Sequence, residues 1–140
     1  MTDVERYVID TSGIMALRGD EPGADRVEEL LRKADSLEVE ALVSFMTRME
    51  LLYRIATDEG PAAAEEALRL LDSTAVIWVS CEPAILAEAA RIKAGGGLSV
   101  ADAWIAATAR VRGAILVHRD PEFERVGDVR HETLLPKHPR

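Results

Sequence analysis

Short runs of apolar, often β-branched residues alternate along the chain with longer segments in which apolar residues recur every three or four positions. The short runs have the length of buried strands, and the longer segments have the period of helices with one apolar face. One such face, in a helix predicted over residues 23–35, carries Val27, Leu30, Leu31 and Ala34. The pattern predicts alternating strands and helices, uninterrupted by a repeat, a low-complexity tract or a linker.

The predicted strands cover residues 6–10, 40–45, 75–80 and 114–118, with a possible edge strand at 128–135. The predicted helices cover 13–19, 23–35, 47–60, 61–73, a segment around Ile85, Ala89 and Ile92 that ends at Gly95–Gly97, and 99–112, with an apolar stripe of Val100, Trp104, Ala107 and Val111. Strands separated by helices form parallel sheets with right-handed crossovers. We therefore predict a three-layer α/β/α fold around a parallel sheet of four to five strands. It forms one domain over residues 1–140, with a frayed tail at 136–140.

Composition excludes several classes of protein. A chain of 140 residues suits one domain, and 48% hydrophobic with 30% charged residues is atypical of disordered and of membrane proteins. The first ten residues carry acids in place of the basic, apolar pattern of a secretory signal, so we expect a cytoplasmic protein. Cys81 is the only cysteine, which excludes an internal disulfide and a cysteine-rich zinc site. We expect it to be a small buried residue.

The net charge of −8 argues against a broad basic face that binds nucleic acid through many phosphates. It does not exclude nucleic acid as a substrate, because bound divalent cations reverse the local charge of a carboxylate cluster.

Four acids fall at strand ends or in first helical turns: Asp10, Glu50, Asp102 and Asp120. Functional groups of parallel sheets collect beyond the carboxyl ends of the strands. Hard divalent cations such as Mg²⁺ prefer oxygen ligands, and such clusters are suited to phosphodiester hydrolysis. The sequence thus makes these four residues candidate metal ligands.

Each acid also has a structural explanation. Thr47 with Glu50, and Ser99 with Asp102, match the capping box at a helix start. The acid that ends the first strand could cap the next helix, and Asp120 before a proline could be a turn residue.

Four segments, VIDTSGIMAL, TRMELLYR, LSVADAWIAATA and LVHRDPEF, occur in an order and at intervals that resemble the PIN-domain nucleases. The resemblance is strongest to the VapC-like toxins of toxin–antitoxin pairs, and it covers nearly the whole chain. The first and third segments are specific, whereas Thr-x-x-Glu alone is a weak signal.

The resemblance implies a metal-dependent endoribonuclease, a hydrolase that uses Mg²⁺ or Mn²⁺ and inhibits translation or growth as a toxin. In this family pattern Asp10 and Asp102 hold the metal, while Glu50 and Asp120 bind directly, through water, or at a second metal. The metal activates a water, which attacks the phosphate and leaves a 5′-phosphate and a 3′-hydroxyl. The hydroxyls of Thr11 or Ser12 would support the site.

One segment departs from the family pattern, in which relatives often have Thr-x-Asp where this chain has His118-Arg119-Asp120. The imidazole of His118 could contact metal or phosphate, or simply pack at the end of its strand.

Other residues have weaker claims to contact RNA. Basic candidates for an RNA-facing rim are Arg48, Arg54, Lys93, Arg110, Arg112 and Arg119. The triplet Gly95–Gly97 could present amides to a phosphate or could end a helix. Trp78 and Trp104 could stack on bases, but their positions favour the core.

The resemblance also implies partners, namely a second copy of the chain and a cognate antitoxin that lays a segment across the acids. Apolar faces at 23–35 and 49–58 favour self-association. Two alternatives stay open: a catalytically silent PIN-like binding module, and a receiver-type phosphoacceptor domain. The receiver is disfavoured because Asp10 is followed by hydroxyl residues rather than by another acid.

Overall fold

The computed structural model describes residues 3–136. Its strands are β1 (Glu5–Ile9), β2 (Val39–Ser44), β3 (Ile77–Val79), β4 (Ile115–His118) and β5 (Arg130–Thr133). Its helices are α1 (Thr11–Arg18), α2 (Ala24–Asp35), α3 (Phe45–Glu59), α4 (Pro61–Asp72), α5 (Pro83–Ala94), α6 (Val100–Arg112) and the short 3₁₀-helix η1 (Pro121–Arg125).

The five strands form one sheet in the order β3-β2-β1-β4-β5, and all neighbouring pairs are parallel. Strand β1 lies in the centre, with Val8 opposite Leu42 of β2 and Leu116 of β4. The edge strand β5 pairs with β4 through the register Leu116 to His131. These pairings confirm the predicted parallel sheet and its fifth, edge strand.

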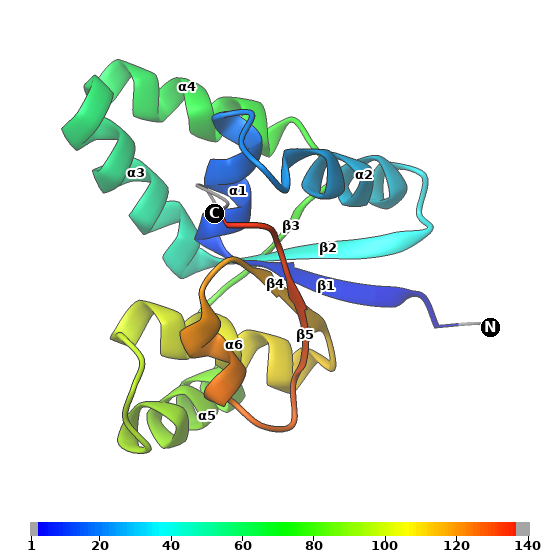
Figure 1. Ribbon diagram of the computed structural model, residues 1–140, viewed down its shortest axis with the longest axis vertical. Coiled ribbons are helices and arrows are strands. Elements are labelled where there is room, and N and C mark those ends of the chain that lie inside the picture. The colour runs from blue at the N-terminus through cyan, green and yellow to red at the C-terminus, as the bar shows by residue number, and fades with distance from the viewer. Residues whose placement is uncertain (1–2, 137–140) are drawn as a thin grey trace.

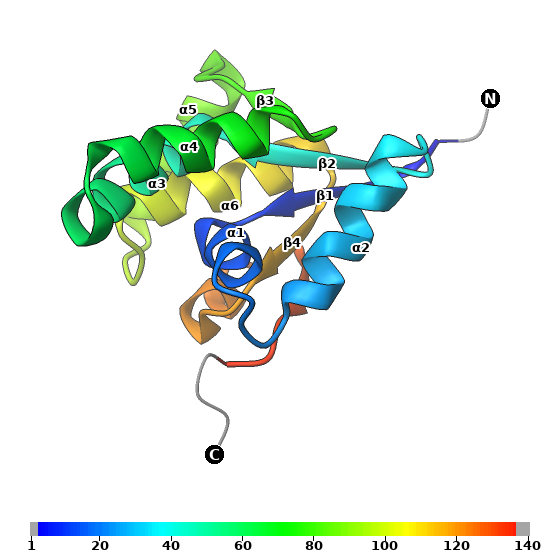
Figure 2. The ribbon, with the colours of Figure 1, turned by 90° about the horizontal axis from the view of Figure 1, so that it is seen from above.

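Helices cover both faces of the sheet, as Figures 1 and 2 show: α1 to α4 lie on one side, and α5 and α6 lie on the other. Adjacent strand residues point to opposite faces, so Val8 belongs to the core under α5 and α6, whereas Ile9 belongs to the core under α1 and α2. The predicted three-layer α/β/α architecture is confirmed.

The start of α3 differs from the prediction. Ser44 caps this helix, and its hydroxyl accepts a hydrogen bond from the Met46 amide at 3.2 Å. The helix therefore begins at Phe45, and Thr47 lies inside its first turn, fully buried. The predicted capping box of Thr47 and Glu50 is wrong, because the strand before it ends one residue earlier, at a better placed cap.

Two further expectations on burial are wrong. Cys81 is exposed, because β3 ends at Val79 and the chain has already left the sheet. In α6 the predicted stripe is misplaced at both ends, since Val100 and Val111 are exposed. Small residues fill the buried face instead: Ala103, Ala106, Ala107 and Ala109.

The two tryptophans are half-buried. Trp104 packs edge-on against Phe45, with ring centroids 5.0 Å apart, which confirms its expected place in the core. Trp78 also packs against a core cluster, while Arg48 stacks 4.6 Å from its ring. Within residues 3–136 no helix is long and apolar enough to cross a membrane. The tail predicted to fray lies, from residue 137 onward, outside the described residues.

Candidate active site

The central strands bring two of the four acids to one edge of the sheet. Asp10 directly follows β1, and its amide donates to the Val117 carbonyl of β4 at 2.9 Å. Asp120 follows the end of β4 by two residues. The other two acids are on helices: Glu50 lies in the second turn of α3, and Asp102 in the first turn of α6.

Asp10 is the most enclosed of these acids, with 4% of its surface exposed. It caps α1, because its Oδ2 accepts from the amide of Ser12 at 3.1 Å and from the Ser12 hydroxyl at 2.5 Å. Its Oδ1 is buried and has no hydrogen-bond partner among the described residues. Burial raises the pKa of Asp10 to about 6, helped by the charges of Asp102 and Glu50 and opposed by the Ser12 bonds. Asp10 is therefore a buried carboxylate with one oxygen held and one unpaired.

Glu50 is held by hydroxyl and guanidinium groups. The Thr11 hydroxyl donates to its Oε1 at 2.7 Å and also hydrogen-bonds to Thr47 Oγ1 at 2.9 Å. Arg54, one helical turn further along α3, donates to Glu50 Oε2 at 3.2 Å. Glu50 is only 6% exposed, so these contacts replace its lost solvation. The sequence analysis missed the roles of Thr47 and Arg54, although the Glu50–Arg54 spacing of four is a recognised helical ion-pair signal.

Asp102 follows Ser99, the N-cap of α6, by three residues. The Ser99 hydroxyl accepts a hydrogen bond from the Asp102 amide at 3.1 Å. This bond confirms the predicted cap. Burial raises the pKa of Asp102, and the negative charge of Glu50 raises it further. The charge of Asp120 acts in the same direction, which shows that Asp102 is electrostatically coupled to the other acids.

Asp120 has the structural role that its position before Pro121 suggested. Its Oδ1 accepts from the Glu122 amide at 2.9 Å, so Asp120 caps η1. Its charge nevertheless acts on Asp102. The two explanations of Asp120, as turn residue and as member of the acidic group, are compatible.

We call Asp10, Glu50, Asp102 and Asp120 the acidic cluster. Within residues 3–136 no three His, Cys, Asp or Glu side chains converge as a ready-made metal shell. The donor set still fits a hard divalent cation, because all its members offer carboxylate oxygens and Asp10 Oδ1 is buried without a partner. Burial raises the pKa values of Asp10 and Asp102, repulsion between the acids raises them further, and a bound cation would relieve that repulsion.

His118 does not join the acidic cluster. It is fully buried, packs on Phe123 with ring centroids 5.0 Å apart, and its Nε2 lies 3.1 Å from Nδ1 of His131. His131 Nε2 in turn lies 3.1 Å from the Val126 carbonyl oxygen. Burial lowers the pKa of His118, and His131 lowers it further. The packing interpretation of His118 is confirmed, and the sequence analysis missed its partner His131.

Several basic residues predicted to contact RNA already have partners in the fold. Arg119 is 10% exposed, pairs with Glu21 at 2.7 Å, and donates through its backbone amide to Ser12 Oγ at 3.1 Å. Arg48 pairs with Asp72 at 2.6 Å. The remaining contacts are Lys93 to the Leu98 carbonyl, Arg110 to Glu88, and Arg112 to Glu82. Their contact with RNA stays a prediction, whereas Arg119 clearly supports Ser12 and through it Asp10.

Comparison with known protein families identifies the family to which this site belongs. The sequence profile of the PIN domain matches residues 7–129, a span that contains all four acids. The chain belongs to the PIN domain family. This assignment replaces the receiver-type alternative. No curated protein sequence matches this PIN domain.

Solved structures share the PIN fold over nearly the whole chain. VapBC2 from Rickettsia felis, bound to a promoter DNA fragment, matches with a TM-score of 0.75 at 17% identity, covering 92% of this chain and 98% of that one. VapBC-1 from Haemophilus influenzae matches with a TM-score of 0.71 at 25% identity, covering 91% and 97%. The Mycobacterium tuberculosis toxin VapC20, described as cleaving the sarcin–ricin loop, matches with 0.66 at 19%, covering 89% and 98%. This PIN domain therefore has the fold of VapC-type toxins.

Proposed function

We propose that this PIN domain is a Mg²⁺- or Mn²⁺-dependent endoribonuclease that acts as the toxin of a toxin–antitoxin pair. The observation that carries the proposal is the coupled acidic cluster, in which buried Asp10 keeps one oxygen without a partner. The similarity to VapC20, described as a toxin that cleaves the sarcin–ricin loop, supports RNA as the substrate class. In this account Asp10 and Asp102 hold the cation, and Glu50 and Asp120 bind it directly, through water, or at a second metal.

The bound cation would acidify a water and stabilise negative charge on the phosphate. Hydrolysis of this kind would join the water oxygen to phosphorus and break the bond to the 3′-oxygen, which would take up a proton, so that a 5′-phosphate and a 3′-hydroxyl would result. Ser12 orients Asp10 by holding Oδ2, so that Oδ1 is the oxygen free to act. Thr11 fixes Glu50 in the same way. Arg54 forms an ion pair with the buried Glu50 and offsets part of the negative charge of the acidic cluster.

A cognate antitoxin is the second partner in this proposal. The similar solved structures from Rickettsia felis and Haemophilus influenzae are VapBC proteins, and this chain shares their fold. A cluster of carboxylates is a natural target for an arginine from such a partner, because the guanidinium fork pairs with carboxylates and takes the place of a cation.

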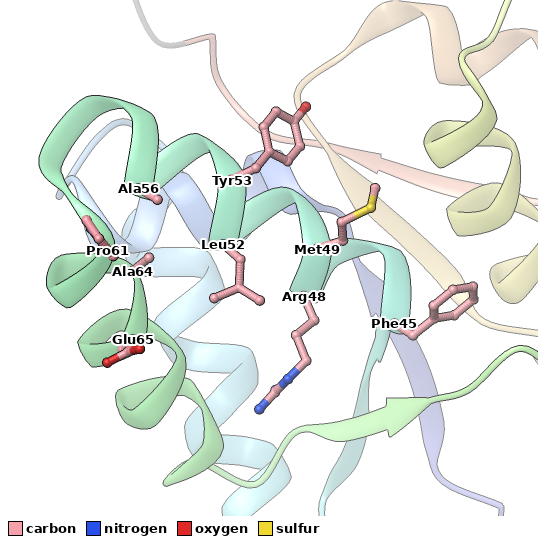
Figure 3. A pocket seen from close by; sticks show the side chains of 9 residues that line it. All are labelled: Phe45, Arg48, Met49, Leu52, Tyr53, Ala56, Pro61, Ala64 and Glu65. Atoms are coloured by element: carbon pink, nitrogen blue, oxygen red, sulfur yellow. The ribbon is translucent and has the colours of Figure 1, made fainter.

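A homodimer is also part of the proposal. An apolar groove of about 640 Å³ lies between α3 and α4. Met49, Leu52 and Tyr53 of α3 are among the residues that line it (Figure 3). Tyr53 is 52% exposed, although it is a large aromatic residue. Arg48 and Glu65 also line the groove, and a two-fold contact would bring this patch of one copy against the same patch of the other. We assign this groove to a second copy of the chain.

The alternative is a catalytically silent PIN domain that only binds partners. The observation in its favour is that no three acids converge within residues 3–136. Incubation of purified protein with a panel of structured RNAs and Mn²⁺ or Mg²⁺ separates the two functions. The nuclease requires products that disappear with EDTA and with Asp102→Asn. Products that persist in both controls, or none with wild type, would favour the silent domain.

A further inference from the structure

A polar cavity of about 490 Å³ lies between α5, α6 and the segment after η1, and the acids of the acidic cluster do not line it. Three arginines and one acid line it: Arg91, Arg110, Arg125 and Glu88. Glu88 accepts hydrogen bonds from both Arg91 and Arg110. One carboxylate therefore pairs with two guanidinium groups, and the third, that of Arg125, has no acid of its own among the described residues that line the cavity. We call this the arginine cavity. It is a positively charged hollow in a chain whose net charge is −8.

Arg125 differs from most other arginines of the described residues because it forms no ion pair. Within residues 3–136, every arginine except Arg32 and Arg125 forms an ion pair with a carboxylate. Arg110 also retains an unused donor, since its Nε is buried without a hydrogen-bond partner in the described part of the chain. The arginine cavity thus contains one guanidinium group, that of Arg125, whose charge no carboxylate of the described residues compensates.

The side chain of Arg125 packs against the loop that follows α5. A Cβ atom at Gly97 would lie 2.9 Å from Nη1 of Arg125, so the side chain packs directly on the glycine backbone. Gly97 also has a φ of +91°, a conformation that favours glycine. Its neighbour Gly96 has a similar φ of +81°, but a Cβ there would meet nothing within 4 Å. The triplet ends α5, as predicted, and Gly97 additionally permits the close approach of Arg125.

The arginine cavity is connected to the acidic cluster by two segments of chain. Leu98 lines the cavity and precedes Ser99, the cap of the helix that carries Asp102. On the other side, η1 begins after Asp120 and ends at Arg125, a distance of roughly 10 Å at 2 Å per residue. Figure 1 shows η1 beside α6 and near the α5–α6 loop. Arg125 is thus separated from Asp120 by one short 3₁₀-helix, close enough for a single strand of nucleic acid to contact both.

We propose that the arginine cavity binds a backbone phosphate of the RNA substrate, on a nucleotide near the one that is cleaved. This inference rests on the proposed ribonuclease function. The guanidinium fork matches phosphate oxygens and holds its charge at every physiological pH. Arg125, which has no ion pair among the described residues, supplies this fork here, and it lies in the same cavity as Arg91 and Arg110. The cavity would fix the direction and register of the RNA strand, without reading its sequence.

Binding of a fluorescent oligoribonucleotide in EDTA, at several salt concentrations, tests the proposal without requiring cleavage. Arg125→Gln should weaken binding roughly 3- to 10-fold and lower the slope of log affinity against log salt by about one, because one phosphate contact is lost. Arg32→Gln removes the other arginine without an ion pair, which lies on α2, and should bind like wild type. Equal affinity and slope for the two variants would overturn the proposal.

Two glycine variants separate the arginine contact from backbone strain. Gly97→Ala strains the backbone and also displaces Arg125, whereas Gly96→Ala only strains it. Because the flexible end of Arg125 can shift away from an added Cβ, the proposal predicts that Gly97→Ala weakens RNA binding less than Arg125→Gln but more than Gly96→Ala. The double variant of Gly97 and Arg125 should bind no more weakly than Arg125→Gln. An equal loss in Gly96→Ala would instead assign the effect to the loop and overturn the proposal.

The source of the phosphate and the nuclease function are tested by separate arms. Titration with AMP and with inorganic phosphate shows whether a free anion fills the arginine cavity. Dependence of AMP binding on Arg125, with RNA binding independent of it, would overturn the RNA assignment. Wild type that binds RNA through Arg125 but cuts none would support the phosphate contact and contradict the nuclease function on which its place beside a cleaved nucleotide rests. If Arg125→Gln leaves both metal-dependent cleavage and RNA binding unchanged, the phosphate contact is overturned, whereas the nuclease function still holds.

Discussion

Thr11 donates a hydrogen bond to Glu50 across 2.7 Å, joining the first residue of α1 to the second turn of α3. The two residues are 39 positions apart in the chain, and both are buried. The bond fixes the orientation of Glu50, and it comes from the residue that directly follows Asp10, another acid of the acidic cluster.

Replacing Thr11 by valine keeps the shape and removes the donor. Thr11→Val should lower the free energy of unfolding by about 1 to 3 kcal/mol, because a buried carboxylate loses a charge-assisted hydrogen bond. Thr57→Val is the matched control, since its hydroxyl bonds the Tyr53 carbonyl at an exposed position of α3. Urea unfolding at pH 7 measures both. Equal effects of the two substitutions would show that the Thr11–Glu50 bond does not stabilise the fold.

The raised pKa of Asp10 predicts the pH dependence of the metal-free protein. Its folded pKa of about 6 lies above the unfolded value of about 3.9, so the folded state holds a proton that the unfolded state releases. Stability gained from this group is complete below about pH 4 and is lost as the pH rises through 6. The loss is up to about 3 kcal/mol.

Asp10→Asn should therefore stabilise the metal-free protein at pH 7.5, since the amide oxygen can still accept from Ser12 while the buried charge is gone. The difference from wild type should shrink towards pH 4. Thermal unfolding with EDTA measures it, and Asp35→Asn, at an exposed position of α2, is the control. A constant difference between Asp10→Asn and wild type at all pH values would contradict the raised pKa.

His118 should act in the opposite direction. Burial lowers its folded pKa, so this group costs nothing above the unfolded value of about 6.5, and stability falls as the pH drops below that value. In an Asp10→Asn background, which removes the largest opposing titration, His118→Gln should flatten the loss of stability between pH 7 and pH 5. An unchanged slope would mean that another group titrates.

The groove between α3 and α4 should determine the oligomeric state. Leu52→Glu places a charge on its apolar lining and should convert a dimer to a monomer. Leu86→Glu makes the same change at another exposed helical leucine, on α5, and should leave the dimer intact. Sedimentation velocity distinguishes them. A dimer that survives Leu52→Glu would place the interface elsewhere.

Much of the fold could be predicted from the sequence, because strand ends and helix starts are local signals, whereas the joint role of the four acids stays a prediction. The start of α3 could not, since Ser44 and Thr47 are both plausible caps and the length of the preceding strand decides between them. The exposure of Cys81 depends on the same kind of boundary.

Contacts between distant segments were also beyond local reasoning. Nothing near Thr11 in the sequence indicates Glu50 as its partner. The pairing of His118 with His131 follows from the register of an edge strand, in which Leu116 lies opposite His131. The buried face of α6 likewise depends on how the helix lies against the sheet, which buries its alanines and Ile105 and leaves Val100 and Val111 exposed.

Binding of Mn²⁺, followed by the loss of the free-ion signal in electron paramagnetic resonance, tests the central claim most directly. The account predicts that wild type binds Mn²⁺, that Asp10→Asn and Asp102→Asn each weaken binding at least about tenfold by removing a ligand charge, and that Asp35→Asn binds like wild type. Equal Mn²⁺ binding by all four proteins, or none by wild type, would contradict a metal site in the acidic cluster and favour the silent PIN domain.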